Sequence, residues 1–323
     1  MRPAREADAG VHVDVTGRLL EATVVAHEGV HAGQSVWERW NFDPELVFPV
    51  LLLTALYLRG LWVWRNRTRQ HPHWRTVCYL LGMLGLLASV ESPLDAAAEH
   101  HFSMHMIQHE IMMMWVAPLI LLGAPTTPVL RGIPRGIRRR FVRPVVRRRE
   151  TYILYRVVSH PVVALGTFTA VLGLWHFAPG WYDAAIRDDF IHDVQHFSFT
   201  LIGVLIWWNV IDPKPLRSRL GYVGRMGFLV VASTPKSFLG AIIVFAEEPL
   251  YEFWFDVEPL LALTPLEDQE LGGLLMWVPS QMMFLLAIGV VFAVWAQKSE
   301  ERQREEDEAR LAAAAAAQAG SGS

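Results

Sequence analysis

Long apolar stretches alternate with short polar segments along most of the chain. About 20 consecutive apolar residues form a helix long enough to span a lipid bilayer. Seven stretches approach or exceed this length, and they lie at 45–64, 76–92, 101–123, 159–178, 191–211, 223–246 and 271–296. The pattern therefore predicts an all-α integral membrane protein with seven transmembrane helices, of which the second is the shortest.

Basic residues gather in alternate connections between these stretches. The most basic segment follows the third stretch and reads RGIPRGIRRRFVRPVVRRR, and the connections after the first and fifth stretches are also rich in arginine and lysine. The other connections carry one basic residue or none, and residues 247–270 are strongly acidic. Because short cytoplasmic loops are enriched in Lys and Arg, we expect the N-terminus outside and the C-terminus in the cytoplasm.

This topology divides the chain into three parts. We expect residues 1–44 to form an extracytoplasmic segment with a short amphipathic helix, residues 45–296 the membrane domain, and residues 297–323 a cytoplasmic tail. At a membrane face, we expect the arginine-rich loop to set the orientation of the chain in the membrane and to contact anionic lipids. We therefore predict membrane lipids, and no nucleic acid, as partners. The single cysteine, Cys78, excludes an internal disulfide and a CxxC metal or redox motif.

Histidines gather at the predicted outer ends of three apolar stretches. Seven of the 13 lie there: His100, His101, His105, His109, His176, His192 and His196. Residues four apart lie on one face of a helix, and such a histidine pair can bind a single metal ion. Polar groups within a membrane helix almost always face the bundle interior. We therefore predict a metal site just below the outer surface, made by His105, His109, His192 and His196.

Other residues are candidates for roles around this site. His101 lies near its predicted mouth and is a candidate for a further ligand. Met104 flanks His105 and is a candidate for the path by which a metal reaches the site, because thioether sulfur is a soft ligand. In the N-terminal segment, the sequence HEGVH places His27 and His31 four residues apart. This pair either passes a metal to the deeper site or is an ordinary part of the surface.

The apolar stretches also carry three distinctive motifs. In chain order they read FSMHMIQHEIMMMWVAPLILLGAP, LWHFAPGWYDAAIRDDFIHDVQHFSFTLIGVLIWW and TPLEDQELGGLLMWVPS. Together they resemble the multi-span bacterial CtaG family of caa3-type cytochrome c oxidase assembly proteins. The resemblance implies a protein of the bacterial cytoplasmic membrane that delivers copper to oxidase subunit I. It also implies functional roles for the residues that match the motifs: His105, His109, His176, His192, His196 and Asp268.

Two charged residues fall within apolar stretches. Lys236 lies near the middle of the sixth stretch, and Glu110 lies at a comparable depth in the third. A charge at the centre of a membrane helix costs about 3 kcal/mol or more, so we predict that these side chains form an ion pair. The alternative is that Glu110 binds the metal, or accepts a hydrogen bond from a metal-binding histidine.

Three functions fit this set of residues. The first is an assembly factor that binds and delivers copper, although imidazole also suits zinc. The second is a membrane-embedded enzyme whose metal site activates water. The third is a redox subunit whose haem is held by one histidine from each of two helices. We favour the first, which requires no catalytic residue; the metal's identity and the oligomeric state stay open.

Overall fold

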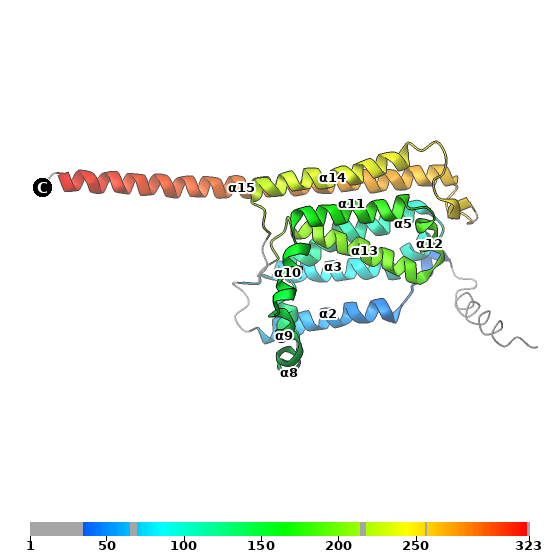
Figure 1. The fold of residues 1–323 in the computed structure, drawn as a ribbon, viewed down its shortest axis with the longest axis horizontal. Helices are drawn as coiled ribbons and strands as arrows, with labels where there is room; N and C mark the ends of the chain where they lie inside the picture. The colour runs from blue at the N-terminus through cyan, green and yellow to red at the C-terminus, as the bar shows by residue number, and fades with distance from the viewer. Residues whose placement is uncertain (1–34, 65–69, 214–217, 256, 322–323) are drawn as a thin grey trace, which may run out of the picture.

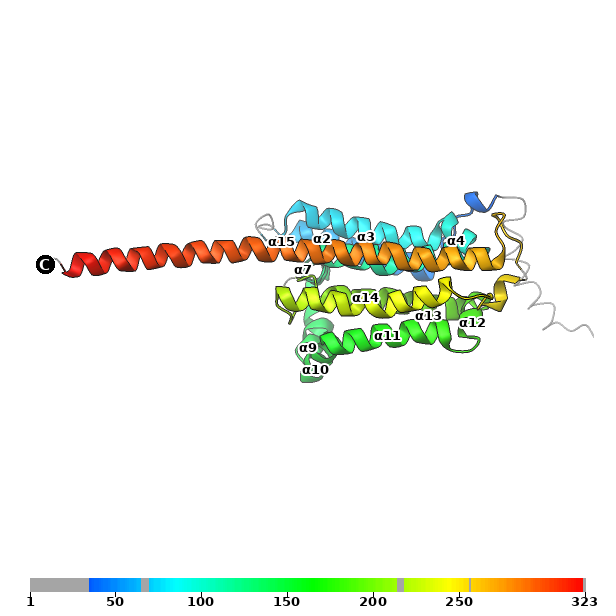
Figure 2. The same cartoon turned by 90° about the horizontal axis from the view of Figure 1, so that it is seen from above.

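The structure is a computed structural model that describes residues 35–64, 70–213, 218–255 and 257–321, and these residues are helical almost throughout (Figure 1). The long helices run side by side. They are α2 (Pro44–Val63), α3 (His73–Glu91), α11 (Pro161–Phe177), α13 (Asp189–Trp208), α14 (Tyr222–Val244) and α15 (Pro265–Ser321). Another long rod consists of three successive elements: α5 (Phe102–Glu110), η2 (Ile111–Val116) and α6 (Ala117–Leu122). Helix α15 continues far beyond the bundle (Figures 1 and 2).

Short helices lie at the two ends of the bundle. One end carries η1 (Val36–Glu38), α4 (Pro93–Ala98), α12 (Trp181–Arg187) and η4 (Glu252–Phe255). The other end carries α7 (Thr126–Gly132), α8 (Arg135–Ile137), η3 (Arg138–Val142), α9 (Arg143–Val146) and α10 (Arg149–Val158). The ends therefore differ in charge, because the arginine-rich segment lies wholly at the second one.

The number of membrane spans follows in part from these helices. Five are long and apolar enough to cross a membrane: α2, the α5–η2–α6 rod, α13, α14 and α15. Helices α10 and α11 meet the same standard together but are bent by 65°, which allows up to six spans. Helix α3 runs alongside the others (Figure 2) and does not meet that standard. The helical membrane class is confirmed, while the count of seven and the orientation of the termini stay predictions.

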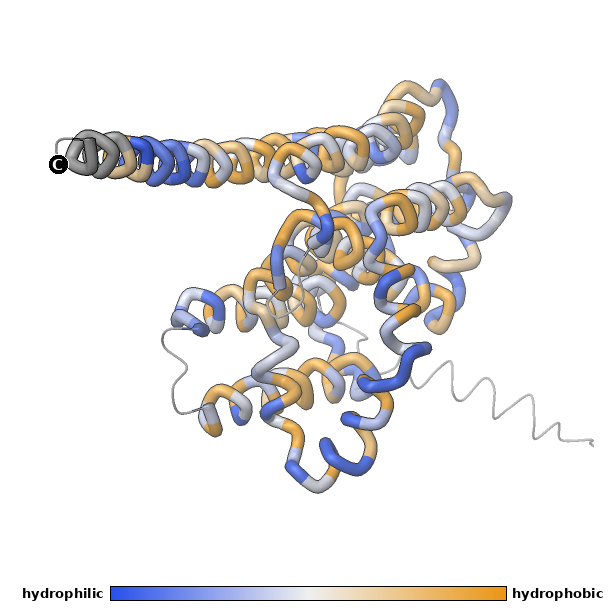
Figure 3. Tube along the Cα trace, turned by 60° about the vertical axis from the view of Figure 1, so that its left-hand side comes forward, coloured by the Kyte–Doolittle hydropathy of each residue, from blue (hydrophilic) through white to orange (hydrophobic). Residues whose placement is uncertain are grey.

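The outward faces of the bundle are apolar, as a lipid environment requires. Large hydrophobic side chains are exposed on several long helices, including Phe48, Leu84, Phe238 and Leu285. Figure 3 shows hydrophobic colour along the long helices and a hydrophilic stretch on α15 before its grey C-terminal end. The boundary between the membrane domain and the C-terminal tail stays a prediction.

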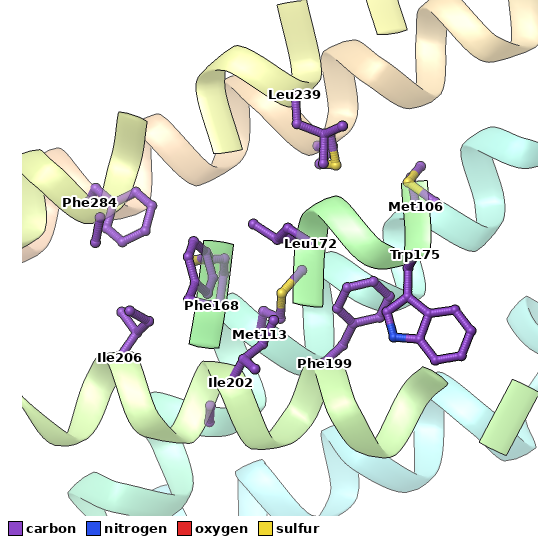
Figure 4. Packing of buried hydrophobic residues seen from close by; sticks show 14 of the residues in the cluster. Met106, Met113, Phe168, Leu172, Trp175, Phe199, Ile202, Ile206, Leu239 and Phe284 are labelled. Carbon is purple, nitrogen blue, oxygen red and sulfur yellow. The ribbon is translucent and has the colours of Figure 1, made fainter. Parts of the chain in front are cut away.

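The main hydrophobic core lies among the α5–η2–α6 rod, α11, α13, α14 and α15. Met113, Phe168, Leu172, Phe199 and Ile202 belong to it and are almost fully buried. Figure 4 shows these side chains filling the space between the helices. The methionines that follow Glu110 are thus packing residues, which is a common use of this flexible side chain.

The third apolar stretch is not a regular α-helix, because residues Ile111–Val116 form the π-helix η2. Its widened turn is stabilised from outside, since Trp207 Nε1 donates a hydrogen bond of 2.9 Å to the Met113 carbonyl. Gly203, one turn before Trp207, lies so close that an added Cβ would be 2.9 Å from Met113 Cα. Helix α13 therefore packs directly against the rod, and both elements carry predicted site histidines.

Candidate metal site

The site is a cluster of three histidines from two helices. His105 of α5 places its Nε2 atom 3.3 Å from Nε2 of His196 and 3.2 Å from Nε2 of His192, both on α13. The ligand atoms of the three side chains all lie within 4.8 Å of one another. Zinc–imidazole bonds of about 2.0–2.1 Å in a tetrahedron place neighbouring ligand atoms about 3.3 Å apart. The spacing in this histidine cluster therefore suits one ion of that size.

Burial explains why such an arrangement calls for a cation. His105 is fully buried and His196 is nearly so, whereas His192 is half-buried. A hydrogen bond between two Nε2 atoms needs one protonated nitrogen as donor and one unprotonated nitrogen as acceptor. Three Nε2 atoms that face one another therefore cannot all be paired by hydrogen bonds among themselves. A bound cation would accept all three lone pairs at once. The half-buried His192 marks the side of the cluster nearest to solvent.

His105 is held in place by a residue that the sequence patterns did not single out. The Tyr182 hydroxyl of α12 lies 2.6 Å from Nδ1 of His105. When Nδ1 donates its proton to this oxygen, the lone pair of Nε2 is free to bind a metal. Tyr182 is buried and lies within the second resemblance motif. Tyr182 lies in the connection between two apolar stretches, and a tyrosine there carries no further signal from which this contact could be predicted.

His109 is the candidate for a fourth ligand. Its ring centroid lies 4.1 Å from that of His105 and 5.2 Å from that of His196. The side chain is almost fully buried, and within the described part of the chain neither ring nitrogen has a hydrogen-bond partner. A buried polar group without a partner is costly, and metal binding would remove that cost.

His176 lies beside the histidine cluster, not within it. Its Nδ1 donates to the Leu172 carbonyl at 3.1 Å, so this hydrogen bond stays within α11. Its ring centroid is 5.9 Å from the ring of Tyr182. Nε2 of His176 is buried and has no hydrogen-bond partner among the described residues. His176 therefore borders the tyrosine that orients His105.

Asp268 and His101 form a separate network next to the site. Asp268 accepts hydrogen bonds from the backbone N–H groups of Phe102 and Ser103 at 2.6 and 3.3 Å, and one of 2.5 Å from the Ser103 hydroxyl. His101 Nδ1 lies 3.3 Å from Asp268 Oδ1, and its Nε2 accepts from the backbone N–H groups of Leu260 and Leu261. These two residues thus fix the N-terminus of α5, where free N–H groups and the helix dipole favour a carboxylate.

The structure describes only one of the three residues predicted to lie on a path to the site. Met104 is half-buried on α5. His27, His31 and the expected amphipathic helix lie outside the described residues. The segment HEGVH also has the His-Glu-x-x-His spacing that zinc proteases use, and this spacing keeps the metal-dependent enzyme among the alternatives.

The two charged residues of the apolar stretches are in contact below the histidines. Lys236 Nζ donates a hydrogen bond to Glu110 Oε2, and Ser280 Oγ donates to Glu110 Oε1 at 2.6 Å. Lys236 is fully buried and Glu110 is 6% exposed. Both carboxylate oxygens are therefore engaged, and Glu110 is not a ligand in this arrangement although it follows His109 directly.

The half-buried carboxyl group of Asp95 supports another part of α5. Gln108 Nε2 donates to Asp95 Oδ1 at 2.7 Å and to the Ser89 carbonyl at 2.7 Å, and Asn41 Nδ2 donates to Asp95 Oδ2 at 3.1 Å. Asp95 belongs to α4, outside the long helices. Burial raises the pKa of its carboxyl group to about 7. The network links α4 to the residue that immediately precedes His109.

The fold and the site define a polytopic helical membrane protein with a buried histidine cluster near one end of its bundle. The chain belongs to the family of cytochrome c oxidase caa3 assembly factors (Caa3_CtaG), whose family model matches residues 55–298. All the residues of the histidine cluster lie within that range.

Curated relatives are found in mycobacteria. Proteins described as uncharacterized from Mycobacterium bovis and Mycobacterium tuberculosis are each 28% identical over 265 residues, which cover 80% of this chain and 40% of each relative. A protein of Mycobacterium leprae with the same description is 27% identical over the same length. The chain thus spans about two fifths of the length of these relatives. No solved structure matches the chain.

Proposed function

We propose that this protein binds copper at the cluster of His105, His192 and His196 and delivers it during assembly of a haem–copper cytochrome c oxidase. Two findings support the proposal: membership of the assembly-factor family and the convergence of three imidazole nitrogens at ligand spacing. The second finding carries the proposal, because no packing requirement brings together the Nε2 atoms of two buried histidines and one half-buried histidine. We place the protein in the bacterial cytoplasmic membrane, with oxidase subunit I as the recipient.

The donor set fits a metal that is bound for transfer. Imidazole nitrogen binds copper and zinc, while thiolate and thioether sulfur favour Cu(I). The three clustered ligands are all imidazoles, and His109 offers a fourth. A site without thiolate releases copper more readily than a cysteine site does, and release is what delivery requires. Copper here is cargo, so its partner's ligands would replace the imidazoles, beginning at half-buried His192.

Metal analysis of the full-length protein tests this function. Protein purified in detergent is loaded with copper or zinc, desalted and measured by elemental analysis. We expect close to one copper per chain, with loss of copper from His105→Ala and from His196→Ala. His73→Ala is the matched control, because His73 is an exposed histidine at the other end of the bundle. Equal copper content in all four proteins would refute the site.

Delivery is tested separately in cells. Deletion of the gene should leave oxidase subunits synthesised while the copper-dependent absorption and activity of the oxidase are lost. The His105→Ala protein should fail to restore them, and the His73→Ala protein should restore them fully. Strong Soret absorption of the purified protein would instead support the haem-binding alternative. Normal oxidase in the deletion strain would contradict the assembly function and favour the enzyme.

A further inference from the structure

The segment 135–158, called the arginine arm here, has no part in the proposed copper function. It consists of α8, η3, α9 and α10 and crosses the end of the bundle opposite to the histidine cluster (Figure 1). The chain turns by 65° between α10 and α11. The arm therefore runs across the ends of the long helices, as an element lying in the plane of a membrane surface would.

The arm exposes apolar and basic side chains together. Phe141, Tyr152, Leu154 and Val157 are 60%, 56%, 64% and 50% exposed. Such side chains alternate with the arginines along the arm. A helix that combines an apolar face with a face rich in Lys and Arg binds at the boundary between lipid headgroups and acyl chains. The amphipathic character of the arm thus indicates contact with a lipid surface.

A cavity on the arm has a lining that suits a lipid headgroup. Its volume is about 520 Å³, and it lies between α10, the start of α11 and the segment before α14. Three arginines and a histidine supply its polar wall: Arg149, Arg156, Arg219 and His160. The remaining lining residues are Tyr152 and three aliphatic residues, Ile153, Val157 and Val163. The lining therefore combines positive charge with apolar side chains.

Two contacts of the lining arginines link the parts of the chain that form the cavity. Arg219 Nη2 donates a hydrogen bond of 2.5 Å to the Arg156 carbonyl, which ties the segment before α14 to the arm. The guanidinium group of Arg156 lies 5.7 Å from the centre of the Tyr152 ring. Within the described residues, none of the three lining arginines forms an ion pair with a carboxylate. Their charge is thus available to an anion.

We propose that this cavity binds the phosphate group of an anionic phospholipid, with the acyl chains lying along Ile153, Val157 and Val163. Guanidinium groups bind phosphate through paired, charge-assisted hydrogen bonds, and basic pockets at the membrane surface bind lipid headgroups. The apolar lining residues favour a lipid over a free phosphate ion. The site would anchor the arginine arm, and with it the end of α11, to one leaflet.

Native mass spectrometry of the full-length protein in detergent tests the proposal. The probes are phosphatidylglycerol and phosphatidylcholine with matched acyl chains. We expect the protein to retain phosphatidylglycerol preferentially. The double variant Arg149→Gln/Arg156→Gln should lose one retained phosphatidylglycerol, with binding at this cavity weakened about tenfold or more, because two charge-assisted donors are removed.

The control variant is Arg147→Gln/Arg148→Gln. It removes the same charge from exposed positions of the same arm that do not line the cavity, and it should retain the lipid. Equal loss in both variants would show nonspecific attraction and overturn the proposal. Equal retention of the two lipids would also overturn it and favour an acidic protein segment as the occupant. Displacement of phosphatidylglycerol by excess inorganic phosphate would overturn it in favour of a free anion.

Discussion

The buried ion pair of Lys236 and Glu110 makes a quantitative prediction about stability. Lys236 is fully buried, and Glu110 has both oxygens engaged by Lys236 and Ser280. Lys236→Met leaves the Glu110 carboxylate buried without its counter-charge. Glu110→Gln likewise leaves the Lys236 ammonium group buried without a counter-charge. Breaking a buried ion pair in this way costs about 3–5 kcal/mol. Each single variant should lose about that much free energy of unfolding.

The double variant should recover most of the loss. Methionine is close to lysine in volume and needs no partner, and a glutamine at position 110 still accepts the hydrogen bond from Ser280. Replacing both members of a buried pair is often neutral, so the coupling energy of the double-mutant cycle should be about 3 kcal/mol or more.

Reversible unfolding in mixed micelles, titrated with sodium dodecyl sulfate, measures the free energy of unfolding of the unsubstituted protein, the two single variants and the double variant. Ser233→Ala and Gln297→Ala provide the control pair. Ser233 lies on α14 with Lys236 and is half-buried, and Gln297 lies on α15 with Ser280 and is exposed. Their effects should be small and additive. If Lys236→Met and Glu110→Gln each destabilise the protein and their effects simply add, the two charges do not stabilise each other.

Three further predictions concern the surroundings of the histidine cluster. Tyr182→Phe removes the hydroxyl that contacts His105, so copper affinity measured by competition with a chelator should fall about 10- to 100-fold; unchanged affinity would contradict the orienting role. Gly203→Ala forces a Cβ to within 2.9 Å of Met113 Cα and should destabilise the protein by about 1–3 kcal/mol, whereas Gly227→Ala, where the space is open, should not. Asp95 holds its proton up to about pH 7 in the folded protein but only to about pH 4 when unfolded. The folded state therefore binds more protons in that window, and stability should fall as the pH rises from about 4 to 7. Asp95→Asn should flatten this decline in thermal unfolding, and an unchanged slope would show that another group causes it.

The bundle and the meeting of the histidines could be predicted because both depend on strong, simple constraints. Apolar length predicts the helices. Polar side chains at a shared depth in a membrane must face one another, which is how His105 and His196 come together from segments 91 residues apart. The contact between Lys236 and Glu110 follows from the same reasoning, since each is an isolated charge in apolar surroundings.

The supporting contacts could not be predicted because they depend on how the helices approach. The sequence resemblance marks Asp268 as functional, yet only the tertiary structure shows that it caps the N-terminus of α5. The π-helix after Glu110 is contacted by Trp207, which donates to the Met113 carbonyl from a different helix. Tyr182 likewise reaches His105 from a short helix, α12, that no apolar periodicity indicates.

X-ray absorption spectroscopy of the copper-loaded, full-length protein tests the central claim most directly. We expect a first shell of three or four imidazole nitrogens at about 2.0 Å, contributed by the histidine cluster and His109. That shell should disappear from the spectrum of the His105→Ala protein. A first shell dominated by sulfur or by carboxylate oxygen, or an unchanged spectrum in that variant, would show that copper is held elsewhere.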